Sequence, residues 1–325
     1  MLTTESHKAV TEINRLGKEH LPFLFIIDFE MNSPVIIKLS DVGGNILYKV
    51  GNFNNISSPK AAKSSLQFEK FPISYELYFQ AFNKVMENIK NGNTYLLNLT
   101  FPTKLKTNCT LEEIFYFAEA KYKLYFEDKF VVFSPETFIQ INNGKIFSFP
   151  MKGTIDASID NAETKLLGDE KELAEHNTIV DLIRNDLSIV AKNIRVEKFR
   201  YIEEIKTSHK TLLQTSSIIC GELKKNFNET IGEIIFNLLP AGSISGAPKK
   251  KTVEIIKKTE NYPRNYFTGI FGIFDGVNLD SAVMIRFIEN INSKIYFKSG
   301  GGITFMSNPE LEYQEMIDKV YVPII

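Results

Sequence analysis

The spacing of apolar residues along the chain alternates between the period of a helix and the period of a strand. Apolar positions three and four apart, such as Tyr78, Phe82, Val85 and Ile89, predict a helix over residues 73–90. Similar spacing predicts helices over 111–122, 168–193, 230–239, 249–258 and 309–320. Alternating or β-prone runs predict strands over 94–106, 145–149, 193–201, 212–222 and, punctuated by glycines, within 266–302. We therefore expect an α+β fold.

The first seventy residues have a different pattern. Residues 21–50 indicate strands and turns, with Gly43 and Gly44 at a hairpin, and the polar segment 51–73 is typical of a long loop. No linker divides the chain, so we expect one compact domain overall. In it, a short strand-rich region, residues 1–73, packs on a core formed by residues 74–325 and contributes edge strands.

Composition excludes several classes of protein. The 38 basic and 39 acidic residues nearly cancel, which gives no electrostatic reason to expect a nucleic acid or an anionic membrane as partner. No apolar run approaches the ~20 residues of a transmembrane helix, and residues 1–12 contain no signal-peptide core. Two cysteines without a C-x-x-C pair fit a reducing compartment, so we expect a cytoplasmic protein.

One lysine is the first candidate for chemistry. Lys152 follows the predicted strand 145–149 and stands between an apolar residue and Gly153. Burial or a neighbouring cation would lower the pKa of such an amine and make it a nucleophile, whereas a solvated surface charge is the commoner role. A hairpin turn at 142–144 would bring Glu136 near Lys152, either as an acid/base partner or in a weak surface ion pair.

Two pairs of glutamates are spaced i, i+3 on predicted helices: Glu172 with Glu175, and Glu312 with Glu315. This spacing puts both carboxylates of a pair on one face of the helix. If the two helices faced each other, they would form an oxygen-rich site for Mg²⁺. Each pair taken alone could equally be a solvated helix surface.

Three further segments could contact a ligand. The glycine- and serine-rich segment 240–249, which contains Ser243, precedes a predicted helix and could bind an anion or form a tight turn with an N-cap. Gly301 and Gly302 lie in a glycine run that allows close approach of a ligand or permits a bend. Arg286 interrupts an apolar strand, where it could pair with a carboxylate of the protein or of a substrate.

Taken in order, these motifs resemble the chorismate-utilising enzymes, a family that includes the component I subunits of anthranilate synthase and aminodeoxychorismate synthase and the isochorismate and salicylate synthases. The resemblance covers about residues 75–322. It is carried by the strings Ser-Pro-Glu-x-Phe at 134–138, Pro-Met-Lys-Gly-Thr at 150–154, Lys-Glu-Leu-Ala-Glu-His at 171–176, Ile-Val-Asp-Leu-Ile-Arg-Asn-Asp-Leu at 179–187, Gly-Ser-Ile-Ser-Gly-Ala-Pro-Lys at 242–249, Gly-Gly-Gly-Ile at 300–303 and Pro-Glu-Leu-Glu-Tyr-Gln-Glu at 309–315.

The resemblance implies a fold of antiparallel sheets packed on each other with flanking helices. Lys152 favours the aminodeoxychorismate synthase subgroup, which serves p-aminobenzoate and folate synthesis, because anthranilate synthases usually have a small residue there. In that reading Lys152 adds to C2 of chorismate, Glu136 acts as general acid, and ammonia then adds at C4. Anthranilate synthase component I and a non-catalytic binding module remain the alternatives.

The resemblance also implies ligands and a partner. Mg²⁺ would be held by the four glutamates, and chorismate would contact Arg286, Ser243, Gly301, Gly302 and Lys319. Gln214 stands where the family often has a histidine. Because an amide cannot act as an acid, we expect Glu136 to carry out the proton transfer. No Cys-His-Glu arrangement of an amidotransferase is present in the sequence, so ammonia is expected from a separate glutamine amidotransferase subunit.

Overall fold

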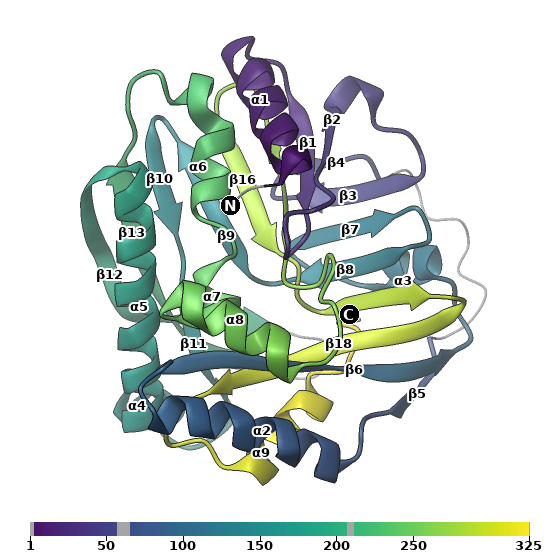
Figure 1. Cartoon of the computed structure of the whole chain (residues 1–325), viewed down its shortest axis with the longest axis vertical. Coiled ribbons are helices and arrows are strands. Elements are labelled where there is room, and N and C mark those ends of the chain that lie inside the picture. Colours follow the sequence, from purple (N-terminus) through teal and green to yellow (C-terminus); the bar gives the residue numbers. More distant parts are fainter. Residues whose placement is uncertain (1–2, 57–65, 207–210, 325) are drawn as a thin grey trace.

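Two antiparallel sheets form the body of the protein (Figure 1). The computed structural model describes residues 3–56, 66–206 and 211–324. The first sheet has the order β11 (Met151–Asp156), β13 (Thr211–Glu222), β10 (Lys145–Ser148), β9 (Thr137–Asn142), β16 (Leu279–Val283), β15 (Ile270–Phe274), β1 (Phe23–Ile27) and β2 (Val35–Lys38), with β12 (Lys192–Lys206) also paired to β13. The second has the order β14 (Gly246–Ala247), β6 (Leu96–Thr107), β18 (Lys294–Ile303), β17 (Phe287–Ile291), β8 (Phe130–Ser134), β7 (Tyr122–Phe126), β3 (Ile46–Val50) and β4 (Phe53–Asn54), with β5 (Phe68–Phe71) also paired to β6.

Strand β1 shows why the two sheets pack together. All five of its residues are buried, because alternate side chains leave the strand on opposite faces. Phe23 and Phe25 join the core beneath the helices of the first sheet. Leu24 and Ile26 join a second core with residues of the other sheet, such as Val132. The expected α+β fold with packed antiparallel sheets is confirmed.

Helices cover the outer faces of the sheets. They are α1 (Thr4–Lys18), α2 (Tyr75–Lys90), α3 (Leu111–Phe117), α4 (Ala162–Gly168), α5 (Glu170–Val190), α6 (Ile231–Asn237), α7 (Gly242–Ser245), α8 (Lys249–Thr259) and α9 (Pro309–Asp318). The predicted helices over 73–90, 168–193, 230–239, 249–258 and 309–320 are therefore present. The helix predicted over 111–122 ends early, because Tyr122 begins β7. Within the described ranges, none of the helices is long and apolar enough to cross a membrane.

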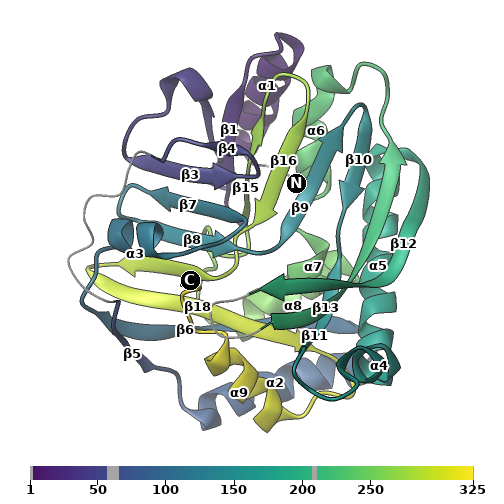
Figure 2. The same cartoon turned by 180° about the vertical axis from the view of Figure 1, so that it is seen from behind.

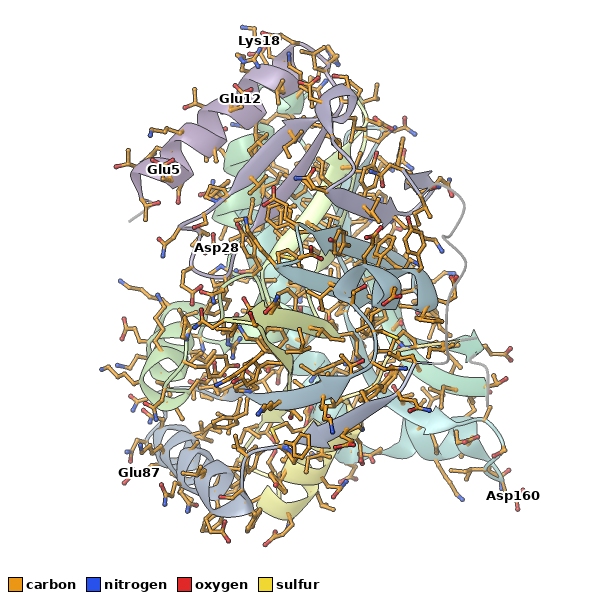
Figure 3. The ribbon with its side chains drawn as sticks, turned by 90° about the vertical axis from the view of Figure 1, so that its right-hand side faces the viewer. Glu5, Glu12, Lys18, Asp28, Glu87 and Asp160 are labelled. Carbon is orange, nitrogen blue, oxygen red and sulfur yellow. The ribbon has the colours of Figure 1, made fainter. Side chains whose placement is uncertain are left out.

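The N-terminal helix α1 was not predicted. Its buried face consists of small or widely spaced residues, Ala9, Ile13 and Leu16, and its other face is charged. Glu5, Glu12 and Lys18 are the labelled acidic and basic side chains along it in Figure 3. A Cβ at Gly232 of α6 would lie 2.5 Å from the carbonyl oxygen of Val10, so this glycine allows the two helices to approach closely. The apolar face of α1 is narrow, so its sequence alone does not predict a helix, and the buried face is recognised only once α6 is seen to pack against it.

Two expectations for the first seventy residues are wrong. Gly43 and Gly44 do not form a hairpin, because β2 before them pairs with β1 and β3 after them pairs with β7 in the other sheet. The segment 51–73 is not all loop, since β4 and β5 lie within it; residues 57–65 of that segment lie outside the described residues. The partners of β3 and β5, which are β7 and β6, are distant in sequence, whereas β4 pairs with the adjacent β3.

One region gathers the elements that carry the candidate residues. Helix α5 packs against β11, and α9 packs against β18, so the first turns of the two helices come close together. Figure 2 shows β11, α4 and α9 in the same lower part of the molecule. This arrangement positions the site described next.

Candidate active site

Lys152 lies in β11, where its carbonyl accepts a hydrogen bond from the hydroxyl of Thr215 on β13. Its side chain is only 21% exposed, and Nζ lies 3.3 Å from Oε2 of Glu175. The next residue, Gly153, has φ +73°, and a Cβ there would lie 3.2 Å from Oε2 of Glu172. Glycine is thus required both by the backbone conformation and by the carboxylate beside it. Lys152 is not a solvated surface charge.

The two glutamate pairs meet at one place, which we call the acidic cluster: Glu172 and Glu175 of α5 with Glu312 and Glu315 of α9. A Cβ at Gly301 of β18 would lie 3.2 Å from Oε2 of Glu312 and 3.5 Å from Oε1 of Glu315. The side chains of Glu175 and Glu312 are 8% and 4% exposed. Lys171 lies within 4 Å of both Glu175 and Glu312, so the first turns of the two helices lie side by side, and the use of these carboxylates as a metal site stays a prediction.

Burial and mutual repulsion work against ionisation in the acidic cluster. Burial raises the pKa of Glu172, and the neighbouring Glu175 carboxylate raises it further. Burial likewise raises the pKa of Glu312. Burial also opposes ionisation of Glu315, but the Lys319 ammonium at 2.5 Å outweighs it and holds that pKa below its usual value. A bound cation would offset this penalty and favour the charged form of these carboxylates.

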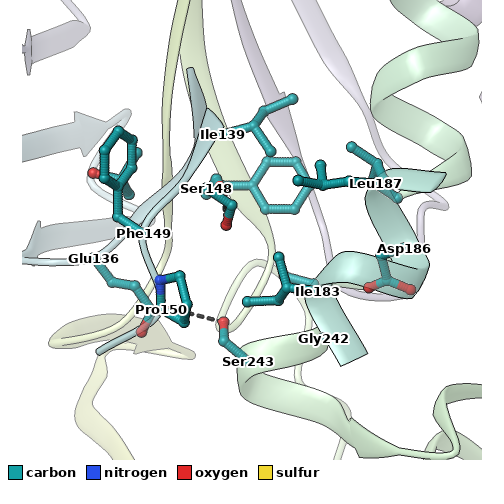
Figure 4. Close-up of a pocket in the computed structure, with 14 residues that line it drawn as sticks. Glu136, Ile139, Ser148, Phe149, Pro150, Ile183, Asp186, Leu187, Gly242 and Ser243 are labelled. Atoms are coloured by element: carbon teal, nitrogen blue, oxygen red, sulfur yellow. Dashed lines mark hydrogen bonds between the residues drawn. The ribbon is translucent and has the colours of Figure 1, made fainter. Parts of the chain in front are cut away.

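Glu136 precedes β9, and the predicted hairpin between β9 and β10 is present. Its carboxylate accepts a short hydrogen bond from the hydroxyl of Ser243 in α7 (Figure 4). Burial raises the pKa of Glu136, while that hydrogen bond and the positive charges of Lys152, Arg286 and Lys319 act in the opposite direction. A carboxyl group with a raised pKa near an amine is suited to donating a proton.

The Glu136–Ser243 pair lies at a narrow pocket between the first sheet and the helices α5 and α7. Figure 4 shows Ile139 and Ser148 on the sheet side and Ile183 and Leu187 on the α5 side. The largely apolar lining explains why burial dominates the pKa of Glu136. The pocket therefore favours the protonated form of this carboxyl.

Arg286 was expected within a strand, but the structure places it outside one. It occupies the break between β16 and β17 with φ +54°, and its guanidinium stacks over the ring of Tyr321 at 5.1 Å. Its Nε is buried without a hydrogen-bond partner. An unsatisfied buried N–H in a guanidinium whose charge acts on Glu136 is a suitable donor for a substrate carboxylate.

The remaining candidates surround Lys152. A Cβ at Gly302 would lie 3.4 Å from Nζ of Lys152, so the absent side chain leaves room for the amine. Lys319 also donates to the carbonyl oxygen of Gly300. Gln214 pairs with Thr154 across β13 and β11, and its Oε1 is buried without a partner. Gly302 and Lys319 thus lie beside Lys152 and Glu315, whereas Gln214 contacts Thr154 at the neighbouring position of β11.

Two residues at the site were missed in the sequence. Nζ of Lys171 lies 3.8 Å from Oε1 of Glu175 and 3.5 Å from Oε1 of Glu312, so it bridges the helices of the acidic cluster. The hydroxyl of Ser307 donates to the same oxygen of Glu312. The i, i+4 spacing of Lys171 and Glu175 was a signal for the first contact. No local signal pointed to Ser307.

The donor set of the acidic cluster fits a hard divalent cation, since carboxylate oxygens are the ligands that Mg²⁺ prefers. Within the described ranges, however, no three His, Cys, Asp or Glu side chains already stand in a metal-binding arrangement. The Lys171 ammonium lies between Glu175 and Glu312 instead. The chemistry of the cluster fits Mg²⁺, and the cofactor stays a prediction.

Comparison with known proteins identifies the family. The model of the chorismate binding enzymes matches residues 38–324. The chain belongs to the chorismate-binding enzymes. It is 51% identical to an uncharacterized PabA-like protein of Haemophilus influenzae, over 97% of this chain and 96% of the relative.

More distant family members have assigned activities. Aminodeoxychorismate synthase component 1 of Escherichia coli is 30% identical, over 82% of this chain and 63% of the relative. The structure of anthranilate synthase component I from Streptococcus pneumoniae superposes with a TM-score of 0.68 at 26% identity, over 82% of this chain and 62% of that one. Membership in the family is thus shown, whereas the reaction of this member is a separate question.

Proposed function

We propose that this chain is an aminodeoxychorismate synthase component I, which replaces the C4 hydroxyl of chorismate with an amino group. The observation that carries the proposal is the position of the Lys152 amine. It lies over Gly302, next to the acidic cluster, in a region where Glu136 responds to its charge. A nucleophile and a carboxyl with a raised pKa in one site are the two groups that a covalent displacement needs.

The proposed reaction has two displacements. Once its ammonium has released a proton, Lys152 adds to C2 of chorismate while the C4 hydroxyl leaves as water, with its proton supplied by Glu136. Ammonia then adds at C4 and expels the Lys152 amine from C2. The net reaction converts chorismate and ammonia into 4-amino-4-deoxychorismate and water, and the lysine is regenerated. Two displacements in place of one retain the stereochemistry at the ring, which is the advantage of a covalent intermediate.

The other side chains hold the substrate. Arg286 and Lys319 provide positive charge for the enolpyruvyl carboxylate, and Gly301 and Gly302 leave the space in which the ring can lie against β18. Ser243 orients Glu136 through its hydrogen bond. Mg²⁺ held by the acidic cluster would supply the charge that binds the ring carboxylate and polarises the ring.

Ammonia comes, in this proposal, from a separate glutamine amidotransferase subunit. The reaction can be tested without that partner by supplying an ammonium salt. The purified chain is incubated with chorismate, MgCl₂ and ammonium, and we expect a product that yields p-aminobenzoate only after an aminodeoxychorismate lyase is added. Direct appearance of fluorescent anthranilate together with pyruvate would identify an anthranilate synthase instead. Chorismate that binds but is not consumed would identify a non-catalytic binding module.

A further inference from the structure

The contacts of Lys171 concern the acidic cluster but have no part in the reaction proposed above. This lysine is the second residue of α5, yet its Nζ reaches carboxylates on two helices, Glu175 of α5 and Glu312 of α9. The other ammonium groups at the cluster each contact one of its glutamates: Lys152 contacts Glu175, and Lys319 contacts Glu315. Lys171 therefore joins the two halves of the cluster.

The two contacts of Lys171 with Glu175 and Glu312 are long and partly exposed to solvent. Distances of 3.5 and 3.8 Å are longer than a direct hydrogen bond between charged groups, which is about 2.7–2.9 Å. The Lys171 side chain is 41% exposed, whereas its two partners are almost fully buried. Lys319, in contrast, is held by a 2.5 Å contact to Glu315 and a hydrogen bond to the Gly300 carbonyl. Lys171 can leave the cluster for solvent at little cost.

A divalent cation and the Lys171 ammonium would compete for the same oxygens. Mg²⁺ binds carboxylate oxygens at about 2.0–2.1 Å, and Glu175 and Glu312 now direct Oε1 at Lys171. Two positive groups held near the same carboxylates would also repel each other strongly in a partly buried site. One of them must move, and Lys171 is the one with access to solvent.

We propose that Lys171 is an internal counter-ion that holds the acidic cluster together in the cation-free protein and is displaced when a divalent cation binds. The inference rests on the cation site of the proposed function, although not on the reaction. It assigns Lys171 a role that weakens cation binding, because part of the attraction between the cation and the carboxylates is offset by the loss of the lysine contacts. It also explains why the described residues contain no ready-made metal arrangement although four glutamates converge.

The first test measures cation binding in the absence of chorismate. Mg²⁺ affinity is determined by isothermal titration calorimetry for the wild-type chain, for Lys171→Met and for Lys165→Met. Lys165 is an exposed lysine of the neighbouring helix α4, so its loss changes the net charge equally without touching the cluster. We expect Lys171→Met to bind Mg²⁺ about tenfold more tightly and Lys165→Met to bind as wild type does. Unchanged or weaker binding by Lys171→Met would overturn the proposal.

The second test uses the unmodified protein, so it does not depend on the folding of a variant. The rate of acylation of each lysine by an amine-reactive ester is followed by peptide mass spectrometry, with and without Mg²⁺. Displacement predicts that Lys171 becomes several-fold more reactive when Mg²⁺ is added, while Lys165 does not change. A Lys171 reactivity that stays constant or falls with Mg²⁺ contradicts displacement. Failure of chorismate amination would leave both results intact, so the two proposals fail separately.

Discussion

Two regions of this protein bury charged side chains, and they differ in how those charges are paired. In the first, Arg264 and Glu260 are each about 1% exposed and form a paired contact at 2.6 and 2.8 Å. The remaining guanidinium donors reach the main-chain carbonyls of Ile244 and Asn98 and the hydroxyl of Thr268. Nearby, Lys298 pairs with Glu289 at 2.5 Å. In these two pairs each positive group has one close negative partner.

The acidic cluster is not balanced in this way. Four carboxylates face three ammonium groups, the contacts of Lys171 are long, and burial raises the pKa of Glu172 and Glu312. Matched pairs are what a buried structural network requires. An excess of buried negative charge has no structural purpose and is typical of a site that binds a positive ligand. The difference between the regions therefore separates a structural network from a functional one.

The strongest test of this comparison is to remove one partner from the matched network. Arg264→Met leaves the Glu260 carboxylate buried without its counter-charge, so we expect the free energy of unfolding to fall by about 3–5 kcal/mol. Urea denaturation followed by circular dichroism measures the change. The double variant Glu260→Gln with Arg264→Met removes the unpaired charge and should recover part of the loss. A single variant within about 1 kcal/mol of wild type would show that the network is not structural.

A smaller effect is expected at His176, a buried neutral histidine of α5 next to the acidic cluster. Burial lowers the pKa of His176 to about 4, against about 6.5 in an unfolded chain. Because the unfolded state gains the proton more readily, this contribution to stability is complete above pH 6.5 and is lost as the pH falls towards 4. The full loss is about 3 kcal/mol.

The variant His176→Gln isolates that contribution, because glutamine can still bond to the Ser217 hydroxyl that now contacts the histidine ring. Unfolding by urea is measured for both proteins at pH 7.5 and pH 4.5. We expect the variant to lose less stability than wild type over this interval. Equal losses in the two proteins would mean that His176 does not titrate on unfolding as described.

The comparison between the regions also shows what the sequence could and could not predict. Lys152, Glu136 and the four glutamates could be found because each stands in a local string or at a helical spacing, and the family resemblance placed those strings in one site. The helix α1, the pairing of β3 with β7, and the bridge formed by Lys171 could not, because each depends on a partner far away in the chain. The local sequence pattern predicts whether a segment is a helix or a strand, whereas its packing partner depends on the tertiary structure.

The smallest predicted effect concerns the proton donor. The Ser243 hydroxyl donates to the Glu136 carboxylate and so favours its charged form. Ser243→Ala removes that donor and raises the pKa of Glu136 further. Since a general acid must be protonated, the alkaline limb of kcat against pH should move upward, by roughly half a unit to one unit. If the alkaline limb of the kcat profile stayed in place or moved to lower pH, Glu136 would not be the general acid.

The central claim, that Lys152 is the nucleophile, is tested most directly with Lys152→Ala. Amination of chorismate is measured with saturating ammonium and MgCl₂, and chorismate binding is measured separately by calorimetry, with Lys165→Ala as the matched control. We predict that the variant loses turnover by about three orders of magnitude or more and still binds chorismate, while the control keeps wild-type turnover. Turnover by Lys152→Ala equal to that of wild type would contradict the account.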